Sequence, residues 1–332
     1  MNKKNIAIVY GGYSSEEVVS SKSAQGIASF LDKQKYNIYL LHIGPKKWMV
    51  RHNEKEIEID KSNFTFKLKQ ETVHFDCAYI TIHGTPGEDG LLQGYLHMLN
   101  IPHTTCDVMA ASITFNKYIC NQLLKSFGLL VANSALVRKE TPYDLNDIAK
   151  TTGFPCFVKP NAGGSSFGIT KVKAMEELDI AIQKAFKESH EVIIEQFIDG
   201  IELTCGLYKT VEKVEVLPLT EVISKNEFFD YEAKYTADKV TEITPARISK
   251  ELTLEIQNRS SVIYDLLNCK GFVRADYILR DNKAFLLEVN TTPGMTPTSF
   301  IPQQIAAKGL DIKEVFSEII EDAIKRNKPI EK

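Results

Sequence analysis

Two short apolar runs near the C-terminal end constrain the fold of this chain more than any other feature. Residues 274–279 read Arg-Ala-Asp-Tyr-Ile-Leu, and residues 285–290 read Phe-Leu-Leu-Glu-Val-Asn. We expect the two runs to pair as neighbouring strands of one hairpin. Side chains two residues apart share a face of a strand, so Glu288 and Asn290 should converge, with Asp276 beside them on the partner strand.

This group of oxygen-bearing side chains is typical of a magnesium site. Carboxylate and amide oxygens are the ligands that this hard cation prefers, and it also takes phosphate oxygens. Arg274 shares a face with Asp276 and would place a permanent positive charge beside the group. A solvated hairpin with its acids in water is the alternative, but Glu288 directly follows Phe-Leu-Leu, which favours the metal site.

Composition excludes several classes of protein. With 332 residues the chain is long enough for two or three domains, and 43% hydrophobic and 25% charged residues are typical of a globular protein. A net charge of −3 gives no electrostatic reason to expect nucleic acid or a membrane as partner. The apolar run at residues 6–9 is too short for a signal peptide, and no window is long enough to span a membrane, so we expect a cytoplasmic location.

The cysteines indicate buried thiols. Most of the six have apolar neighbours, and none forms a Cys-x-x-Cys pair. They are Cys77, Cys106, Cys120, Cys156, Cys205 and Cys269. We therefore expect reduced thiols and neither a disulfide framework nor a zinc site. The seven histidines show no metal-ligand spacing either.

The first hundred residues alternate between strand and helix patterns. We expect strands at residues 5–10, 36–43 and 75–82, and helices ending near residue 31 and spanning 89–99. Such alternation predicts a parallel, doubly wound domain that binds ligands at the carboxyl ends of its strands. Gly11-Gly12 and His83-Gly84 fall at two of these ends. The predicted domain covers residues 1–107.

The remainder predicts a central domain at residues 108–198 and a C-terminal domain at 199–332. The central domain should contain a helix carrying Lys117, strands at 156–159, 169–172 and 192–195, and a helix near 175–188. The C-terminal domain should contain antiparallel strands at 202–208 and 214–220, a helix at 249–268, the hairpin and a last helix. Residues 225–247 form a long polar and aromatic loop, and such loops are usually functional lids or disordered. Its Lys234-Tyr235 pair is either solvated or the tip of a lid.

A glycine-rich turn at residues 163–168 separates two of the central strands. It is neither a Walker loop nor a dinucleotide fingerprint, since both require a strand followed by a helix. Backbone N–H groups in such a turn can wrap phosphate oxygens, although an ordinary turn has the same composition. Lys159 ends the preceding apolar strand, which favours phosphate binding, whereas Lys117 and Lys159 are equally compatible with solvated side chains.

Four other polar residues have two interpretations each on local grounds. Glu195 ends an apolar strand that could hold adenine, and Glu202 could accept a hydrogen bond from a ribose hydroxyl. The local sequence is equally compatible with two solvent-exposed carboxylates on an edge strand. Glu16 either binds a substrate ammonium or favours a helix N-terminus through the helix dipole. His83 is either functional or a hydrogen-bonded residue of a turn.

Taken in order, these segments resemble the D-alanine–D-alanine ligases, an ATP-grasp family of carboxylate–amine ligases in peptidoglycan precursor synthesis. The resemblance covers nearly the whole chain, and its motifs are Gly11-Gly-x-Ser-x-Glu16, His83-Gly-x-x-Gly-Glu-Asp-Gly90, Lys159-Pro-x-x-x-Gly-Ser165-Ser, Tyr231-Glu-Ala-Lys-Tyr235 and Glu288-x-Asn290-Thr-x-Pro-Gly-Met-Thr296. This set, in this order and spacing, is highly specific. It implies a mixed α/β and α+β architecture, namely an ATP-grasp fold with an N-terminal doubly wound parallel-sheet domain.

The resemblance also implies where ATP and metal bind. ATP would lie between the central and C-terminal domains, with Lys234 near its γ-phosphate. The implied ATP-binding residues are Lys117, Lys159, Ser166, Glu195, Phe197, Ile198, Glu202, Phe228 and Lys234. Two Mg²⁺ ions, which Mn²⁺ can replace, would be held by Asp276, Glu288 and Asn290.

Further roles concern the amino acid substrates. Glu16 matches the glutamate that holds the ammonium of the first D-alanine, with His83 nearby. Ser165 and Tyr235 match the residues that link with this glutamate to close the loop. Arg274 and the N–H of Gly294 match the groups that stabilise the oxyanion. Ser299, with Phe300 beside it, matches the group that binds the second D-alanine.

Three positions depart from the family pattern. Glu17-Val18 stands where a basic residue and then a glutamate are common, which affects hydrogen bonding on the substrate side. Gln196 stands where a lysine is frequent, so adenine contact there would be mainly through the backbone. Phe300 replaces a common leucine in the pocket of the second substrate, a change that is mild in volume.

The implied reaction joins two D-alanine molecules with ATP through an acyl phosphate, in a homodimeric enzyme. Two other functions stay open. A depsipeptide ligase would use D-lactate as second substrate, against which Lys234-Tyr235 argues. A nucleotide sensor would have lost catalysis, against which the retained hairpin residues argue. A dehydrogenase is improbable because Gly-x-Gly-x-x-Gly is missing after the first strand.

Overall fold

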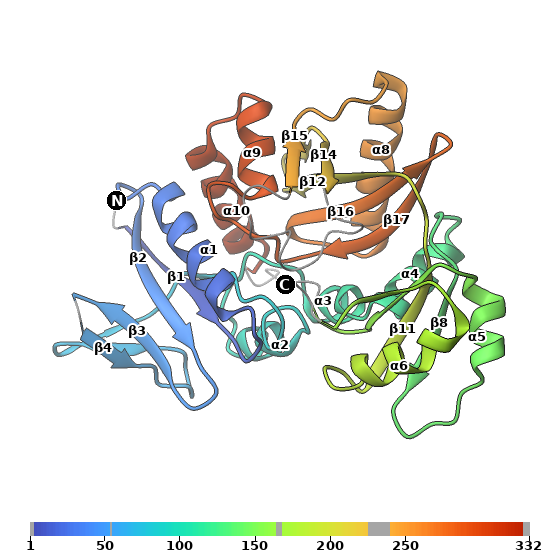
Figure 1. Cartoon of the computed structure of the whole chain (residues 1–332). Helices are drawn as coiled ribbons and strands as arrows, with labels where there is room; N and C mark the ends of the chain where they lie inside the picture. The colour runs from blue at the N-terminus through green and yellow to red at the C-terminus, as the bar shows by residue number, and fades with distance from the viewer. Residues whose placement is uncertain (1–2, 54, 164–167, 225–239, 328–332) are drawn as a thin grey trace, which may run out of the picture.

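A computed structural model describes residues 3–53, 55–163, 168–224 and 240–327 (Figure 1). Within these ranges the strands form sheets of five, four, six and two strands. The smallest sheet pairs β5 (Phe66–Leu68) with β6 (Glu71–Val73). Helices and both parallel and antiparallel strand pairs occur, so the mixed α/β and α+β class predicted from the sequence is confirmed.

The N-terminal sheet has a parallel centre. β1 (Lys4–Gly11) lies between β2 (Tyr36–Ile43) and β7 (Cys77–Ile80), and both pairs are parallel. The helices of this region are α1 (Glu17–Phe30) and α2 (Leu91–Met98). These elements confirm the predicted alternation. The sheet continues with antiparallel β3 (Trp48–His52) and β4 (Lys55–Glu58), which the sequence analysis did not predict.

Burial explains why β1 is a continuous apolar run. Ile6 and Ile8 belong to one hydrophobic cluster, whereas Ala7 and Val9 belong to another on the opposite face. A strand covered on both faces needs apolar residues at every position. The first cluster also contains Phe316 from the C-terminal helix α10 (Ile312–Arg326), so the N-terminal sheet shares a core with the end of the chain.

The central sheet is antiparallel, in the order β10-β9-β11-β8. Its strands are β8 (Ser134–Arg138), β9 (Cys156–Pro160), β10 (Thr170–Val172) and β11 (Glu191–Gln196). Helices α5 (Leu145–Thr152) and α6 (Met175–Ala185) cover one face. Val192 and Ile194 pack beneath these helices, so alternation places Glu191 and Glu195 on the other face.

The C-terminal sheet is antiparallel and carries the acidic hairpin. Its strands are β12 (Ile201–Lys209), β13 (Val214–Val216), β14 (Thr220–Ser224), β15 (Val240–Ile243), β16 (Gly271–Arg280) and β17 (Lys283–Asn290). The helices of this part are α8 (Lys250–Leu266), α9 (Phe300–Ala307) and α10. Two predictions need correction. Residues 214–220 are not one strand: residues 214–216 form the whole of β13, and residue 220 begins β14. Residues 240–243 of the predicted loop form β15, which pairs with β14.

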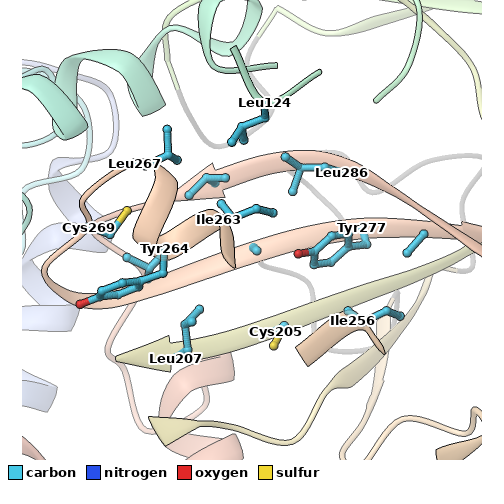
Figure 2. Close-up of a cluster of buried hydrophobic side chains, with 14 of the residues drawn as sticks. Leu124, Cys205, Leu207, Ile256, Ile263, Tyr264, Leu267, Cys269, Tyr277 and Leu286 are labelled. Atoms are coloured by element: carbon cyan, nitrogen blue, oxygen red, sulfur yellow. The ribbon is translucent and has the colours of Figure 1, made fainter. Parts of the chain in front are cut away.

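Two helices connect the central and C-terminal sheets. They are α3 (Val108–Phe115) and α4 (Lys117–Ser126), and both contact β17. Leu124 of α4 lies in the same hydrophobic cluster as Tyr277 of β16 and Leu286 of β17 (Figure 2). The boundaries predicted after residues 107 and 198 stay predictions, but the hydrophobic packing joins α3 and α4 to the C-terminal sheet.

Two predictions about the whole chain can be compared with the structure. All six cysteines are buried and free, as predicted. None of the helices in the described ranges is long and apolar enough to cross a membrane.

The turn after β1 requires its glycines: Gly12 has φ +104°, and an added Cβ would lie 2.6 Å from Ile82 Cγ2.

Candidate functional site

The site lies in a cavity of about 1830 Å³ that is lined by strands of the central and C-terminal sheets and by turns and helix α1 of the N-terminal region. Most of the predicted site residues line it. They are Glu16, His83, Lys117, Lys159, Glu195, Phe197, Ile198, Glu202, Arg274, Asp276, Glu288, Asn290, Gly294, Ser299 and Phe300. Five others lie outside the described residues, namely Ser165, Ser166, Phe228, Lys234 and Tyr235.

The acidic hairpin forms with the expected register. Asp276 on β16 is opposite Glu288 on β17, and Arg274 is opposite Asn290. The four side chains therefore share one face of the sheet, and all four line the cavity. The register shifts between Asp276 and Tyr277, and pairing continues beyond this bulge-like irregularity with Tyr277 opposite Leu286.

Arg274 is held from several sides. Its Nε and Nη2 donate to the Asp276 carboxylate at 2.9 and 2.6 Å, and Nη2 lies 3.8 Å from Glu288 Oε1. The guanidinium lies 5.4 Å from the ring centroid of Phe300, within the range of a cation–π contact. Burial lowers the pKa of Arg274, but the two carboxylates outweigh it and hold the pKa above its usual value. A fixed, permanent cation therefore faces the cavity.

The donor atoms of the hairpin suit a hard divalent cation. Asp276, Glu288 and Asn290 offer two carboxylates and one amide oxygen from adjacent strands. Asp276 Oδ1 also accepts from Thr204 Oγ1 at 2.6 Å, and Asn290 Oδ1 from the N–H of Thr292 at 2.9 Å, so both side chains are held in place. Across the described ranges, no cluster of three or more His, Cys, Asp and Glu side chains could hold a metal, so a cation here needs the amide oxygen too.

Two lysines approach the hairpin from the central region. Lys117 Nζ donates to the carbonyl of Gly163 at 2.6 Å and lies 3.8 Å from Glu288 Oε2. Lys159 Nζ lies 2.5 Å from Glu195 Oε2, and the two side chains are only 8% and 4% exposed. The side chain of Lys117 is only 13% exposed and Lys159 is buried, so neither extends freely from the surface, which counts against the simpler alternative considered for them.

Glu195 has a second partner that the sequence did not indicate. Asn121 of α4 donates from Nδ2 to Glu195 Oε1 at 3.1 Å. Asn121 is buried, and its Oδ1 has no hydrogen-bond partner among the described residues. The carboxylate of Glu195 is thus fixed between Lys159 and Asn121 at the wall of the cavity.

An aromatic platform lies next to Glu195. The rings of Phe157 and Phe197 meet edge to face with centroids 5.8 Å apart, and Lys171 Nζ lies 4.0 Å above the Phe197 ring. Ile198 and Glu202 continue this wall of the cavity. Apolar faces beside a fixed carboxylate are suited to a planar heterocycle that carries an amino group.

The opposite end of the cavity is built on the N-terminal turns. Glu16 is buried directly before α1, and its N–H donates to Ser14 Oγ at 3.3 Å. Ser14 Oγ in turn donates to the carbonyl of His83 at 2.8 Å. His83 Nε2 lies 3.5 Å from Ser23 Oγ, which accepts from the N–H of Met295 at 3.2 Å. The predicted pair Glu16 and His83 is therefore brought together, on a support that includes the C-terminal region.

Burial and charge set the protonation of this end. Burial, and then the nearby Arg274, lower the pKa of His83 to about 4, so the imidazole is neutral at neutral pH. Burial, and then the charge of Glu16, raise the pKa of Glu88 to about 8. Glu88 Oε2 accepts from the N–H of Gly84 at 2.7 Å. Glu88 belongs to the motif that begins at His83, but the sequence predicted no role for it, although its place five residues after His83 was a usable signal.

The N-terminus of α9 faces the same space. Ser299 occupies the residue before α9 but does not cap it. Its Oγ accepts from the N–H of Thr296 at 3.0 Å and lies 2.8 Å from Thr296 Oγ1. A Cβ on Gly294 would lie 3.1 Å from this hydroxyl, so glycine keeps the backbone close to Ser299. Exposed backbone N–H groups and a hydroxyl at a helix start are suited to an anion.

Comparisons with known proteins agree with this geometry. Two family models match, described as D-ala D-ala ligase N-terminus over residues 5–106 and D-ala D-ala ligase C-terminus over residues 123–321. A D-alanine–D-alanine ligase of Bacteroides fragilis is 56% identical over 322 residues, which cover 96% of this chain and 99% of that protein.

Solved structures have the same fold. The VanG D-Ala:D-Ser ligase from Enterococcus faecalis is 29% identical, with a TM-score of 0.87 over 97% of this chain and 100% of that chain. A D-alanine–D-alanine ligase from Bacillus anthracis complexed with ATP is 28% identical, with a TM-score of 0.80 over 98% and 99%. These likenesses confirm the fold predicted from the motifs.

Proposed function

Because this chain belongs to the D-alanine–D-alanine ligase family, we propose that it joins two D-alanine molecules to D-alanyl-D-alanine with ATP. The observation that carries the proposal is the cross-strand group of Arg274, Asp276, Glu288 and Asn290, which faces a cavity with lysines on one side and Glu16 on the other. The product is a precursor of peptidoglycan, and we propose that it is made in the cytoplasm.

The reaction has two steps. An oxygen of the first D-alanine carboxylate attacks the γ-phosphorus of ATP, ADP leaves, and an acyl phosphate results. The amine of the second D-alanine then attacks the acyl carbon, and inorganic phosphate leaves with the original carboxylate oxygen. Both steps concentrate negative charge beside the hairpin, where fixed cations stabilise it.

Nucleotide recognition is assigned to the central wall. Lys117 and Lys159 face the phosphates, Glu195 accepts from the adenine amino group, and Glu202 accepts from the ribose. Phe197 and Ile198 complete this wall. The family resemblance assigns nucleotide contacts to Ser166, Phe228 and Lys234 as well, which lie outside the described residues. Mg²⁺ held by Asp276, Glu288 and Asn290, or Mn²⁺ in its place, would offset phosphate charge during transfer.

Substrate recognition is assigned to the opposite end. Glu16, with His83 beside it, receives the ammonium of the first D-alanine, and Ser299 receives the carboxylate of the second, next to Phe300. Arg274 and the N–H of Gly294 stabilise the oxyanion of the tetrahedral intermediate. Ser165 and Tyr235 would link with Glu16 over the bound substrates, which protects the acyl phosphate from water.

We also propose a homodimer. The family resemblance supports it, and so do exposed apolar side chains on α2 and α3, a pair of helices without acidic residues. Met98 is 80% exposed and Met109 65%, and Leu91 and Val108 of the same two helices are also exposed. Exposed apolar side chains on two contacting helices are typical of an association surface. Light scattering at micromolar concentration would measure the mass directly.

The acceptor of the second step separates this function from its alternatives. Several relatives that are 51–56% identical to this chain are named D-alanine–D-alanine ligase, whereas the D-Ala:D-Ser ligase is 29% identical. A sensor without catalysis would not need Arg274 fixed beside Asp276 and Glu288.

Product identification tests the proposal. Purified protein is incubated with ATP, Mg²⁺ and D-alanine, alone or with D-lactate or D-serine, and the products are identified by mass spectrometry. We expect D-alanyl-D-alanine, ADP and phosphate in equal amounts, and at least a ~100-fold loss in the Glu288→Ala variant. A depsipeptide or D-alanyl-D-serine as main product, or nucleotide binding without turnover, would contradict it.

A further inference from the structure

Helix α4 connects the two parts of the chain between which the nucleotide is proposed to lie. Its buried side chains Cys120 and Leu124 belong to the hydrophobic cluster of the C-terminal sheet. Its first turn instead contacts the central sheet, where Asn116 forms an isolated bridge with Ala162. The position of α4 on the central sheet therefore determines how the two parts face each other.

Asn161 makes most of this contact. It directly follows β9 and is 0% exposed. Its carbonyl accepts from the N–H of Lys117 at 3.1 Å, and its Oδ1 accepts from the N–H of Tyr118 at 2.8 Å. Its Nδ2 donates to Asn116 Oδ1 at 2.9 Å and to Glu191 Oε2 at 2.8 Å. Both the acceptor and the two donor hydrogens of the side-chain amide are used.

These bonds complete the N-terminal cap of α4, to which Asn116 contributes only one acceptor. The first N–H groups of a helix have no partner within the helix. In α4 the N–H groups of Lys117 and Tyr118 are paired by Asn161, and that of Ile119 is paired by Asn116 Oδ1 at 3.0 Å. Most of the cap thus comes from a residue of another element, so the cap also fixes α4 on β9.

Glu191 anchors the other side of Asn161. Its carbonyl accepts from the N–H of Asn161 at 3.0 Å, and its carboxylate accepts from Arg138 Nε at 2.8 Å. Burial raises the pKa of Glu191, but hydrogen bonds from Arg138 and Asn161 outweigh it and hold the pKa below its usual value. The anchor is therefore ionised at neutral pH and strengthens the bond from Asn161.

The cap fixes the position of Lys117, the first residue of α4. Its ammonium lies between the carbonyl of Gly163, two residues after Asn161, and Glu288 on the hairpin. We propose that Asn161, which directly follows β9, is a positioning residue. By capping helix α4 it holds Lys117 where this side chain can contact the phosphates. This inference rests on the proposed function only in requiring that a nucleotide binds at Lys117.

A double-mutant cycle on nucleotide affinity tests the proposal. Calorimetry would measure binding of Mg²⁺ with the non-hydrolysable analogue adenylyl imidodiphosphate to the full chain, the Asn161→Ala variant, the Lys117→Met variant and the double variant. If Asn161 acts through Lys117, Asn161→Ala weakens binding about tenfold when Lys117 is present, and has little effect when Lys117 is already replaced. Equal factors in both backgrounds, or no weakening in either, would overturn it.

The control variant is Asp144→Ala. Asp144 caps α5 of the central region, accepting from the N–H of Asn146 at 2.7 Å, and it is not among the residues that line the cavity. We expect a similar loss of thermal stability but an affinity within roughly twofold of the unmodified chain. If Asp144→Ala weakens binding as much as Asn161→Ala, a general loss of stability explains both and the proposal fails.

A second variant and the choice of ligand make the binding experiment decisive. Should Asn161→Ala not fold, as judged by circular dichroism, Asn161→Ser is used in the same cycle with the same expectations. D-alanine is absent from the binding measurement, so a chain that binds nucleotide but does not ligate D-alanine would contradict the proposed function and leave this test intact. Absence of nucleotide binding by the unmodified chain would contradict both.

Discussion

At Glu195 the structure shows why a buried carboxylate can recognise a ligand. Lys159 and Asn121 each hold one of its oxygens, at 2.5 and 3.1 Å. The strand pattern indicated Glu195 and Lys159, because both end apolar runs. It gave no signal for Asn121, which is 74 residues away along the chain and looks like an ordinary helix residue.

Replacing Asn121 with leucine should therefore weaken ATP binding. Leucine has a similar volume but leaves Glu195 Oε1 without its donor, so we expect the KM for ATP to rise about tenfold and the KM for D-alanine to stay unchanged. Steady-state kinetics with each substrate varied would measure both. Gln122→Leu is the matched control, since Gln122 lies next in α4 and bonds Ser134 rather than Glu195. An unchanged KM for ATP in Asn121→Leu would contradict the role.

Glu88 predicts a pH dependence of stability. Its pKa is raised to about 8, so the folded chain binds this proton more tightly than the unfolded chain does. Its stabilising contribution is complete below the unfolded pKa and is lost as the pH rises toward 8. Glutamine stays neutral and can still accept from the N–H of Gly84.

We therefore expect Glu88→Gln to gain Tm relative to the unmodified chain as the pH rises from 5 to 8, by roughly 2 °C or more. Thermal denaturation followed at several pH values would measure the difference. His83 has the opposite effect on the pH dependence: its pKa is lowered in the folded chain, so its contribution to stability is lost as the pH falls. A constant difference in Tm between the two chains across this pH range would show that Glu88 is not protonated in the fold.

At the scale of elements, α1 is fitted closely to the segment after the hairpin. A Cβ on Gly26 would lie 2.2 Å from the carbonyl oxygen of Met295, a backbone atom that cannot rotate away. The N–H of Met295 donates to Ser23 on the same helix, next to His83. Close packing at Gly26 thus positions the segment that carries Gly294.

Gly26→Ala should lower stability although alanine favours helices. We expect Tm to fall by about 2 °C or more and the KM for D-alanine to rise, because Met295 must move. Gly94→Ala in α2 is the matched control, since its new Cβ would make an ordinary contact of 3.6 Å with Val108 Cγ2. The control should be neutral or gain up to ~1 kcal/mol. A gain in Tm for both variants would contradict the close fit.

Elements whose sequence signal lies within a few neighbouring residues could be predicted, whereas elements that depend on pairing with a distant segment could not. The parallel strands and the acidic hairpin follow from apolar runs and alternation within a few residues. β15 was missed because its four residues, Val-Thr-Glu-Ile, become a strand only by pairing with β14 across the predicted loop. The packing of α4 on β17 was not predicted for a similar reason: the apolar residues of α4 predict a buried face, but they do not indicate which sheet this face packs against.

At the scale of the whole molecule, the cavity depends on contacts between distant parts of the chain. Ser23 and Met295, which meet at the substrate end, are 272 residues apart. The core beneath them joins Ile6 of the first strand to Phe316 of the last helix. Motifs in the right order indicated that these parts meet, but the partners that hold each side chain follow only from the packed structure.

In the proposed reaction a carboxylate is activated by phosphorylation before an amine attacks it. D-alanine labelled with ¹⁸O in its carboxylate tests this directly, with the released phosphate analysed by mass spectrometry. We expect each phosphate to carry one ¹⁸O atom, because the oxygen that attacked the γ-phosphorus leaves with it. Phosphate that contains only unlabelled oxygen, released together with the dipeptide, would contradict it.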